Sequence, residues 1–209
     1  MSAPEVDFYY GIDSRYSYLA ATRIDKLAAE TGARVNWFPL SSSTLMERRG
    51  QNPFAGPPPS GQYDWGFRRR DAEAWADYYG VPFRDPVGRI ELDGPLYARA
   101  CVAAGRMGAL EAYSMALFGA VFVDDPERVD REPCIARAAT VGLERGAFAR
   151  CLDDDATTAL VESILRRALD AGVFGMPTFI VNGALFWGND RLALVRHALR
   201  RYQGMVAAL

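Results

Sequence analysis

Residues 172–179 read Gly-Val-Phe-Gly-Met-Pro-Thr-Phe, and Pro177 stands where an apolar segment suited to a β-strand begins. A β-hairpin is predicted next, with strands over residues 178–181 and 184–187. The turn between them is Asn-Gly at residues 182–183, a pair that tolerates the positive φ angles of a type I′ turn. The segment therefore predicts a proline loop that leads into an antiparallel strand pair.

A second pattern opens the chain. Residues 6–10 are apolar and predict a strand, and residues 13–18, Asp-Ser-Arg-Tyr-Ser-Tyr, follow it. Apolar side chains then recur at helical spacing as far as about residue 31, and Gly32 is a suitable helix C-cap. A second strand is predicted over residues 34–38. A strand, a helix and a strand joined so closely predict a parallel pair with a right-handed crossover.

The residues between the first strand-helix-strand unit and the proline loop predict mainly helices. Residues 51–61 are rich in proline and glycine and predict a loop, and residues 64–79 predict a helix. Four or five helices and no strand are expected between about residues 95 and 171, and a final helix is expected over about 190–202. We therefore expect an α/β chain with the order βαβ, a helical block, and ββα.

Composition excludes several classes of function. The chain has 209 residues and a formal net charge of -2, which gives no electrostatic case for binding nucleic acid or an anionic membrane. Cys101, Cys134 and Cys151 lack a C-x-x-C or metal-ligand spacing, so neither a disulfide framework nor a metal site is expected. The first residues lack a signal-peptide pattern, and no apolar run approaches ~20 residues. A cytoplasmic protein is expected.

Three local sequences resemble those of one family. Residues 14–20 begin with serine where the helix opens, residues 172–179 form a G-V-x-G-x-P-T-F motif, and residues 186–191 form an F-W-G-x-D-R motif. Together they resemble 2-hydroxychromene-2-carboxylate isomerases and kappa-class glutathione transferases, in the DsbA-like branch of the thioredoxin superfamily. The resemblance implies a thioredoxin-like fold (βαβ…ββα) interrupted by an all-helical insertion. Its domains would be residues 1–85 with 172–209, and residues 86–171.

The chain departs from this family at several positions. Arg15 stands where the family has a proline, and Phe54 replaces the second proline of a later loop. Ser60 stands where a basic residue is common. Ser14 and Ser17 occupy both ends of the x-x spacing where a thioredoxin-type redox enzyme carries cysteines, and neither serine can form a mixed disulfide. A disulfide oxidoreductase is therefore disfavoured.

The resemblance implies glutathione as cofactor. Mostly on the resemblance, a cis Met176–Pro177 bond is expected, which would turn the N–H and C=O of Met176 toward a peptide ligand; the alternative is a proline that only opens the strand. In the family, the pair equivalent to Asn189 and Asp190 meets the γ-glutamyl end of glutathione, where a carboxylate can bind the ammonium group. Asn52 is a further candidate contact.

The sulfur of glutathione would lie beside Ser14. A free thiol with a pKa near ~8.5 is only a few per cent thiolate at neutral pH, and lowering the pKa by about two units requires roughly 2.7 kcal/mol. A hydrogen bond from Ser14 could supply about 1.5–3 kcal/mol, and the helix N-terminus up to ~2 kcal/mol. The two together suffice without a histidine, and Ser14 is the candidate catalytic residue.

Plainer roles exist for several of these residues. Ser14 and Asp190 are both suited to be helix N-caps, and Ser17 is suited to packing or capping. His197 is the sole histidine, so a Ser-His-Asp triad is not expected. Six aromatic residues could line an aromatic-substrate pocket or pack in the helix core: Tyr63, Trp65, Phe67, Trp75, Tyr78 and Tyr79.

The leading hypothesis is a glutathione-dependent isomerase acting on a small bicyclic aromatic acid. The resemblance implies transient addition of the glutathione thiolate to the conjugated substrate, rotation about the bond that becomes single, and elimination. Arg15 is a candidate to hold the substrate carboxylate. One alternative is a transferase that conjugates glutathione to electrophiles, and another is a non-catalytic glutathione- or ligand-binding protein. A homodimer is implied by the resemblance.

Overall fold

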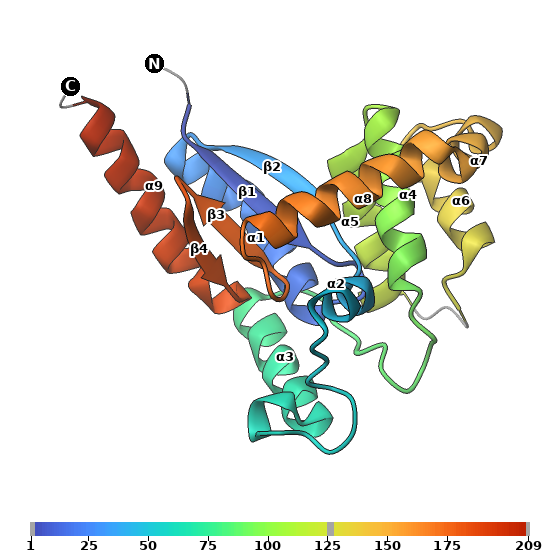
Figure 1. Cartoon of the computed structure of the whole chain (residues 1–209), viewed down its shortest axis with the longest axis horizontal. Coiled ribbons are helices and arrows are strands. Elements are labelled where there is room, and N and C mark those ends of the chain that lie inside the picture. Colours follow the sequence, from blue (N-terminus) through green and yellow to red (C-terminus); the bar gives the residue numbers. More distant parts are fainter. Residues whose placement is uncertain (1–2, 125–127, 208–209) are drawn as a thin grey trace.

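A computed structural model describes residues 3–124 and 128–207, with side chains as far as Arg201 (Figure 1). Its four strands form one sheet in the order β2-β1-β3-β4. β1 pairs with β2 in parallel and with β3 antiparallel, and β3 pairs with β4 antiparallel. The strands are β1 (Glu5–Tyr10), β2 (Arg34–Pro39), β3 (Thr178–Val181) and β4 (Ala184–Trp187). The predicted βαβ and ββα units are thus joined in one sheet.

The hairpin has the predicted turn. Asn182 has a φ of 47° and Gly183 a φ of 79°, as a type I′ turn requires. A short 3-10 turn, η2 (Asn189–Arg191), follows β4, and helix α9 (Leu192–Ala207) begins after it. The last α-helix therefore begins two residues later than the predicted Asp190, because residues 189–191 form the 3-10 turn and not the first turn of the α-helix.

Helix α1 (Arg15–Thr31) connects the two parallel strands. Ser14 is its N-cap, and Gly32 ends it with a left-handed φ of 61°, which costs glycine little because it has no Cβ. Helix α3 (Trp65–Tyr79) was also predicted, whereas α2 (Ser42–Arg49) was not. Helix α2 buries a single side chain, that of Leu45, so its sequence carries little helical periodicity.

The helical insertion contains five helices and no strand within its described residues, as the sequence predicts. Figure 1 shows these helices gathered beside one end of the sheet, with the long α8 crossing in front of it. No helix within the described parts of the chain is long and apolar enough to cross a membrane. The helices are α4 (Gly94–Arg106), α5 (Leu110–Phe122), α6 (Arg131–Thr140), α7 (Arg145–Asp153) and α8 (Asp155–Asp170).

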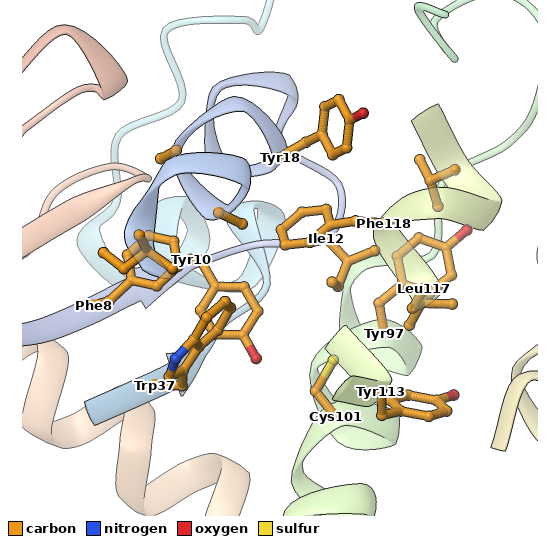
Figure 2. Close-up of a cluster of buried hydrophobic side chains, with 14 of the residues drawn as sticks. Phe8, Tyr10, Ile12, Tyr18, Trp37, Tyr97, Cys101, Tyr113, Leu117 and Phe118 are labelled. Atoms are coloured by element: carbon orange, nitrogen blue, oxygen red, sulfur yellow. The ribbon is translucent and has the colours of Figure 1, made fainter. Parts of the chain in front are cut away.

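One hydrophobic core joins the sheet to the insertion. Phe8 and Tyr10 of β1 are buried on the same face of the strand, where they pack with Trp37 of β2. Figure 2 shows this aromatic cluster continuing into α4 and α5, where Cys101 and Phe118 face it. Because this core holds α1, β1 and the insertion together, it fixes the beginning of α1 relative to the sheet and to the insertion.

Candidate active site

The N-terminus of α1 meets the proline loop at Ser14. The Ser14 side chain accepts a hydrogen bond from the N–H of Ser17 at 3.3 Å, and its Oγ donates to the carbonyl oxygen of Met176 at 3.4 Å. The Met176–Pro177 peptide bond is cis, as predicted. Two segments that lie 162 positions apart in sequence are thus in direct contact at the predicted residues.

Ser17 has a structural role. Its side chain is fully buried, and its Oγ accepts a hydrogen bond from the N–H of Gly11 at 3.3 Å. The bond ties the β1–α1 connection to the first turn of α1. The predicted role in packing or capping is therefore confirmed for Ser17.

Several backbone N–H groups beside Ser14 are free. The N–H groups of Arg15 and Tyr16 precede the first helical hydrogen bond of α1, which runs from Tyr18 N to Ser14 O, and they donate no hydrogen bond within the described residues. The same holds for the N–H of Met176. Unpaired N–H groups at a helix N-terminus favour an anion, and a free N–H in an extended loop can pair with a peptide.

A cavity of about 740 Å³ opens at this junction, a volume typical of small-molecule sites. Its walls come from the first turn of α1, from α2 and the loop after it, from the beginning of α3, and from the proline loop. Aromatic side chains form much of the wall, and they include Phe54, Tyr63, Trp65, Phe174 and Trp187. The site therefore combines an anion-favouring corner with flat apolar surfaces.

The aromatic walls form two groups. Phe54 stacks on Trp65 with ring centroids 4.8 Å apart and meets Tyr63 edge-on at 5.6 Å. Phe174 and Trp187 lie 5.1 Å apart on the side of the proline loop. The exposed rings of Trp65 and Trp187 can stack on an aromatic ligand.

Arg15 forms a buried ion pair beside the cavity. Its Nη1 lies 3.1 Å from Oδ2 of Asp85, and both side chains are about 5% exposed or less. The same carboxylate oxygen also lies 3.6 Å from Nε of Arg69. The ion pair disfavours the expectation that Arg15 binds the substrate carboxylate, because a buried partner already balances its charge, and that role stays a prediction.

Asp13 is a titratable group that the sequence did not single out. Its carboxylate accepts hydrogen bonds from the N–H of Ser42 at 3.1 Å and from the Ser42 hydroxyl at 2.9 Å. Its oxygens lie so close to Gly11 and Gly94 that a Cβ at either glycine would approach them within 2.6 Å. This packing removes water and raises the pKa of Asp13 to about 6.

Asn52 lines the same cavity as Ser14. Its side chain is exposed, and its Oδ1 accepts a hydrogen bond from the N–H of Phe54 at 2.9 Å. The bond closes a local turn, so Asn52 shapes the loop and still presents its amide NH₂ at the cavity. The structure thus brings Asn52, Ser14 and Met176 to one site.

Asn189 and Asp190 lie at a neighbouring site. They line a second cavity of about 730 Å³ between α1, α3 and α9, together with Trp75, Tyr78 and Tyr79. Asp190 pairs with Arg191 at 3.3 Å, and the buried Nδ2 of Asn189 has no hydrogen-bond partner within the described residues. A hydrogen bond of 2.9 Å from Gly188 N to Pro177 O connects this pair to the proline loop.

The cysteines and the histidine considered as reactive groups do not line the Ser14 cavity. Burial raises the pKa of the Cys101 and Cys134 thiols to about 12, which makes them inert small hydrophobes. His197 is exposed on α9. Among the described residues, no cluster of three His, Cys, Asp or Glu side chains could hold a metal ion.

Comparison with known proteins identifies the family and the fold. Residues 5–200 match the family model described as DSBA-like thioredoxin domain. The chain belongs to this family. The predicted thioredoxin-like fold with a helical insertion is therefore confirmed.

Individual relatives in the family are isomerases. The chain is 28% identical over 200 residues to 2-hydroxychromene-2-carboxylate isomerase of Pseudomonas sp. (strain C18), covering 93% of this chain and 89% of the relative. A Pseudomonas putida protein of the same name is 28% identical over 203 residues, with 94% of both chains covered. A solved structure of 2-hydroxychromene-2-carboxylate isomerase superposes with a TM-score of 0.84 at 27% identity, over 98% of both chains. The predicted resemblance to these isomerases is confirmed.

Sequence reasoning missed two groups of cavity residues. Arg49 and Arg68 line the cavity as basic residues on two different helices, and Phe174 and Trp187 form one wall. Phe174 and Trp187 lie inside two of the three motifs that carry the resemblance, which is a signal that could have identified them. No local pattern distinguishes Arg49 and Arg68 from the many other arginines of the chain.

Proposed function

We propose that this protein is a glutathione-dependent isomerase of the 2-hydroxychromene-2-carboxylate type. The observation that carries the proposal is the contact of the Ser14 hydroxyl with the Met176 carbonyl above a cavity lined by aromatic rings. The names of the similar proteins support the reaction class. Glutathione, the dimeric state and the cytoplasmic location stay predictions.

The residues present fit glutathione. The free N–H of Met176 suits an extended peptide, and Ser14 Oγ with the free N–H groups of Arg15 and Tyr16 suits a thiolate. When bound, glutathione supplies a nucleophilic sulfur that adds to a conjugated double bond and later leaves it. Asn52 can donate from its amide to the same peptide.

Ser14 has a defined task in this proposal. Its hydroxyl hydrogen, which bonds Met176 O over a long 3.4 Å, can rotate toward an anion in the cavity. The N-cap bond from Ser17 N remains when it rotates, since the hydroxyl oxygen accepts that bond. The side chain thus stabilises negative charge without giving up its helix cap. The aromatic walls hold the substrate near this corner, and proximity is the second contribution of the protein.

Two measurements test the proposal. Ultraviolet difference titration of reduced glutathione with the protein should reveal thiolate at neutral pH, and Ser14→Ala should lose that signal. Ser14→Ala should also lower kcat by roughly 10- to 100-fold with glutathione affinity mostly kept, as the loss of a charge-assisted hydrogen bond predicts. Unchanged turnover in Ser14→Ala would reject Ser14 as the thiolate partner.

Product analysis separates this reaction from its alternatives. Isomerisation leaves the amount of glutathione constant, whereas a transferase consumes one glutathione for each product. A binding protein would take up glutathione with its thiol pKa near the solution value. A stoichiometric loss of glutathione, or a thiol pKa that binding leaves unchanged, would contradict the isomerase.

A further inference from the structure

Three guanidinium groups line the Ser14 cavity, and they differ in how far their charge is already balanced. Arg15 is paired with the buried Asp85 at 3.1 Å. Arg49 lies at the exposed end of α2, where its Nη1 donates to the carbonyl of Val173 at 3.4 Å. Arg68 has no carboxylate within ion-pair distance among the residues the structure describes. Arg68 is therefore a half-buried cation in this cavity that makes no direct ion pair within the described residues, and Asp71 and Asp85 act on its charge only from beyond ion-pair distance.

The Arg68 guanidinium is also held in a fixed plane. It lies over the Tyr16 ring at 4.9 Å and over the Phe54 ring at 5.0 Å. Tyr16 is in turn fixed by its hydroxyl, which donates to Asp71 at 2.7 Å. Stacking between aromatic faces orients a guanidinium at low entropic cost, so the group is organised before any ligand arrives.

Most of the hydrogen-bonding capacity of this guanidinium is unused. Its Nη1 donates to the carbonyl of Gln62 at 3.2 Å, and its buried Nε has no acceptor within the described chain. A buried donor without a partner costs free energy that a suitable acceptor would recover. The planar fork of arginine matches the two oxygens of a carboxylate.

We infer that Arg68 is the residue that selects the carboxylate of an aromatic acid in this cavity. This inference rests on the proposed function and names the group that recognises its substrate. The acid group lies at the Arg68 fork, and the aromatic ring lies against Phe54 and Trp65, which stack 4.8 Å apart beside it. Ser14 lines the same cavity, so an acid held at Arg68 presents its conjugated system to the corner where the nucleophile is expected.

Arg15 and Arg68 then have different tasks in the same cavity. Arg15 packs its guanidinium 5.3 Å from the Trp65 ring centroid while Asp85 cancels its charge. Arg68 keeps its charge for the ligand. Desolvation lowers the pKa of Arg68 from its usual value, and an anionic ligand would relieve that cost.

A pair of isosteric probes tests the assignment in the full-length protein. 2-Naphthoate and 2-naphthamide share a bicyclic ring and differ in charge, and their binding is measured by isothermal titration calorimetry with saturating reduced glutathione and without it. The wild-type protein should bind the carboxylate about 10- to 100-fold more tightly than the amide, as expected for a charged hydrogen-bonded pair. Arg68→Ala should abolish that preference.

Matched variants separate recognition from folding. Arg70→Ala removes an exposed arginine of the same helix that does not line the cavity, and it should keep the preference. Arg68→Lys keeps the positive charge but lacks the planar guanidinium fork, so it should recover only part of the preference for naphthoate over naphthamide. If Arg68→Ala does not fold by circular dichroism, Arg68→Gln serves as the neutral variant.

The outcomes are separable from those of the proposed function. The assignment is overturned if wild-type protein binds neither probe, if it does not distinguish them, or if the neutral Arg68 variant keeps the preference. A protein that selects naphthoate through Arg68 but shows no glutathione-dependent isomerisation would contradict the proposed function alone. In isomerase kinetics, Arg68→Ala should raise KM about 10- to 100-fold with a smaller change in kcat.

Discussion

The Asp13 carboxyl should make the stability of this protein depend on pH in an unusual direction. Its pKa is raised to about 6 from the usual 3.8 of an aspartate side chain, mainly because burial removes water from the charged form. Between these two values the folded chain binds more protons than the unfolded chain at this site. The free energy of unfolding therefore falls as the pH rises from about 4 to about 6, and the effect is constant above that window.

The magnitude follows from the size of the shift. A difference of about two pH units corresponds to about 3 kcal/mol at 1.36 kcal/mol per unit, and this is an upper limit because Asp13 is partly exposed. Asp13→Asn removes the titration but keeps a group of the same shape. Its carbonyl can accept from the N–H of Ser42, and its NH₂ can donate to the Ser42 hydroxyl.

Urea unfolding at several pH values measures this effect. We expect wild type and Asp13→Asn to have similar stability near pH 4, and the variant to gain up to about 3 kcal/mol relative to wild type by pH 7. Asp154→Asn is a control of opposite sign, since hydrogen bonds from Ala156 N–H and Arg106 lower the pKa of Asp154. Parallel stability curves for wild type and Asp13→Asn between pH 4 and 7 would refute the desolvation argument.

Two further predictions concern the walls of the cavity. Asp85→Asn should destabilise the fold by about 3–5 kcal/mol in denaturant unfolding, because it leaves the buried Arg15 charge without its partner; a loss below 1 kcal/mol would show that the pair is hydrated. Gly175→Ala should keep the fold but reduce turnover, because its new Cβ would lie 2.7 Å from Nε1 of Trp187 and displace that ring. Gly119→Ala is the matched control, since nothing lies within 4 Å of its added Cβ. Unchanged turnover in Gly175→Ala would contradict a role for Trp187.

The fold was largely predictable because its signals are local. The Asn-Gly turn at 182–183, the C-cap at Gly32 and the N-cap at Ser14 each depend on the conformation of a few neighbouring residues. Helix α2 has caps of the same kind at Ser41 and Gly50, but it was missed because it buries Leu45 alone and so shows little apolar periodicity. The contact between Ser14 and Met176 was predictable only through the family resemblance, because no local rule joins segments 162 positions apart.

The charges of the site were not predictable from sequence. Whether an arginine is a ligand or a packed ion pair depends on which carboxylate lies beside it in space. Asp85 pairs with Arg15 across 70 positions of sequence, whereas Arg68 makes no ion pair within the described residues. The packing of Asp13 against Gly94 likewise depends on where α4 begins relative to β1.

The departure at Arg15 has a structural explanation in this arrangement. A proline at that position would fix the first turn of α1 through its ring, whereas Arg15 fixes the same turn by its ion pair with Asp85. Asp85 precedes Pro86 and Val87, which line the cavity, so the pair joins the first turn of α1 to another segment of the cavity wall. Arg69 approaches the same carboxylate from α3 at 3.6 Å. A cation at position 15 therefore stabilises the walls around Ser14, and under our inference recognition of an acid is left to Arg68, which makes no direct ion pair within the described residues.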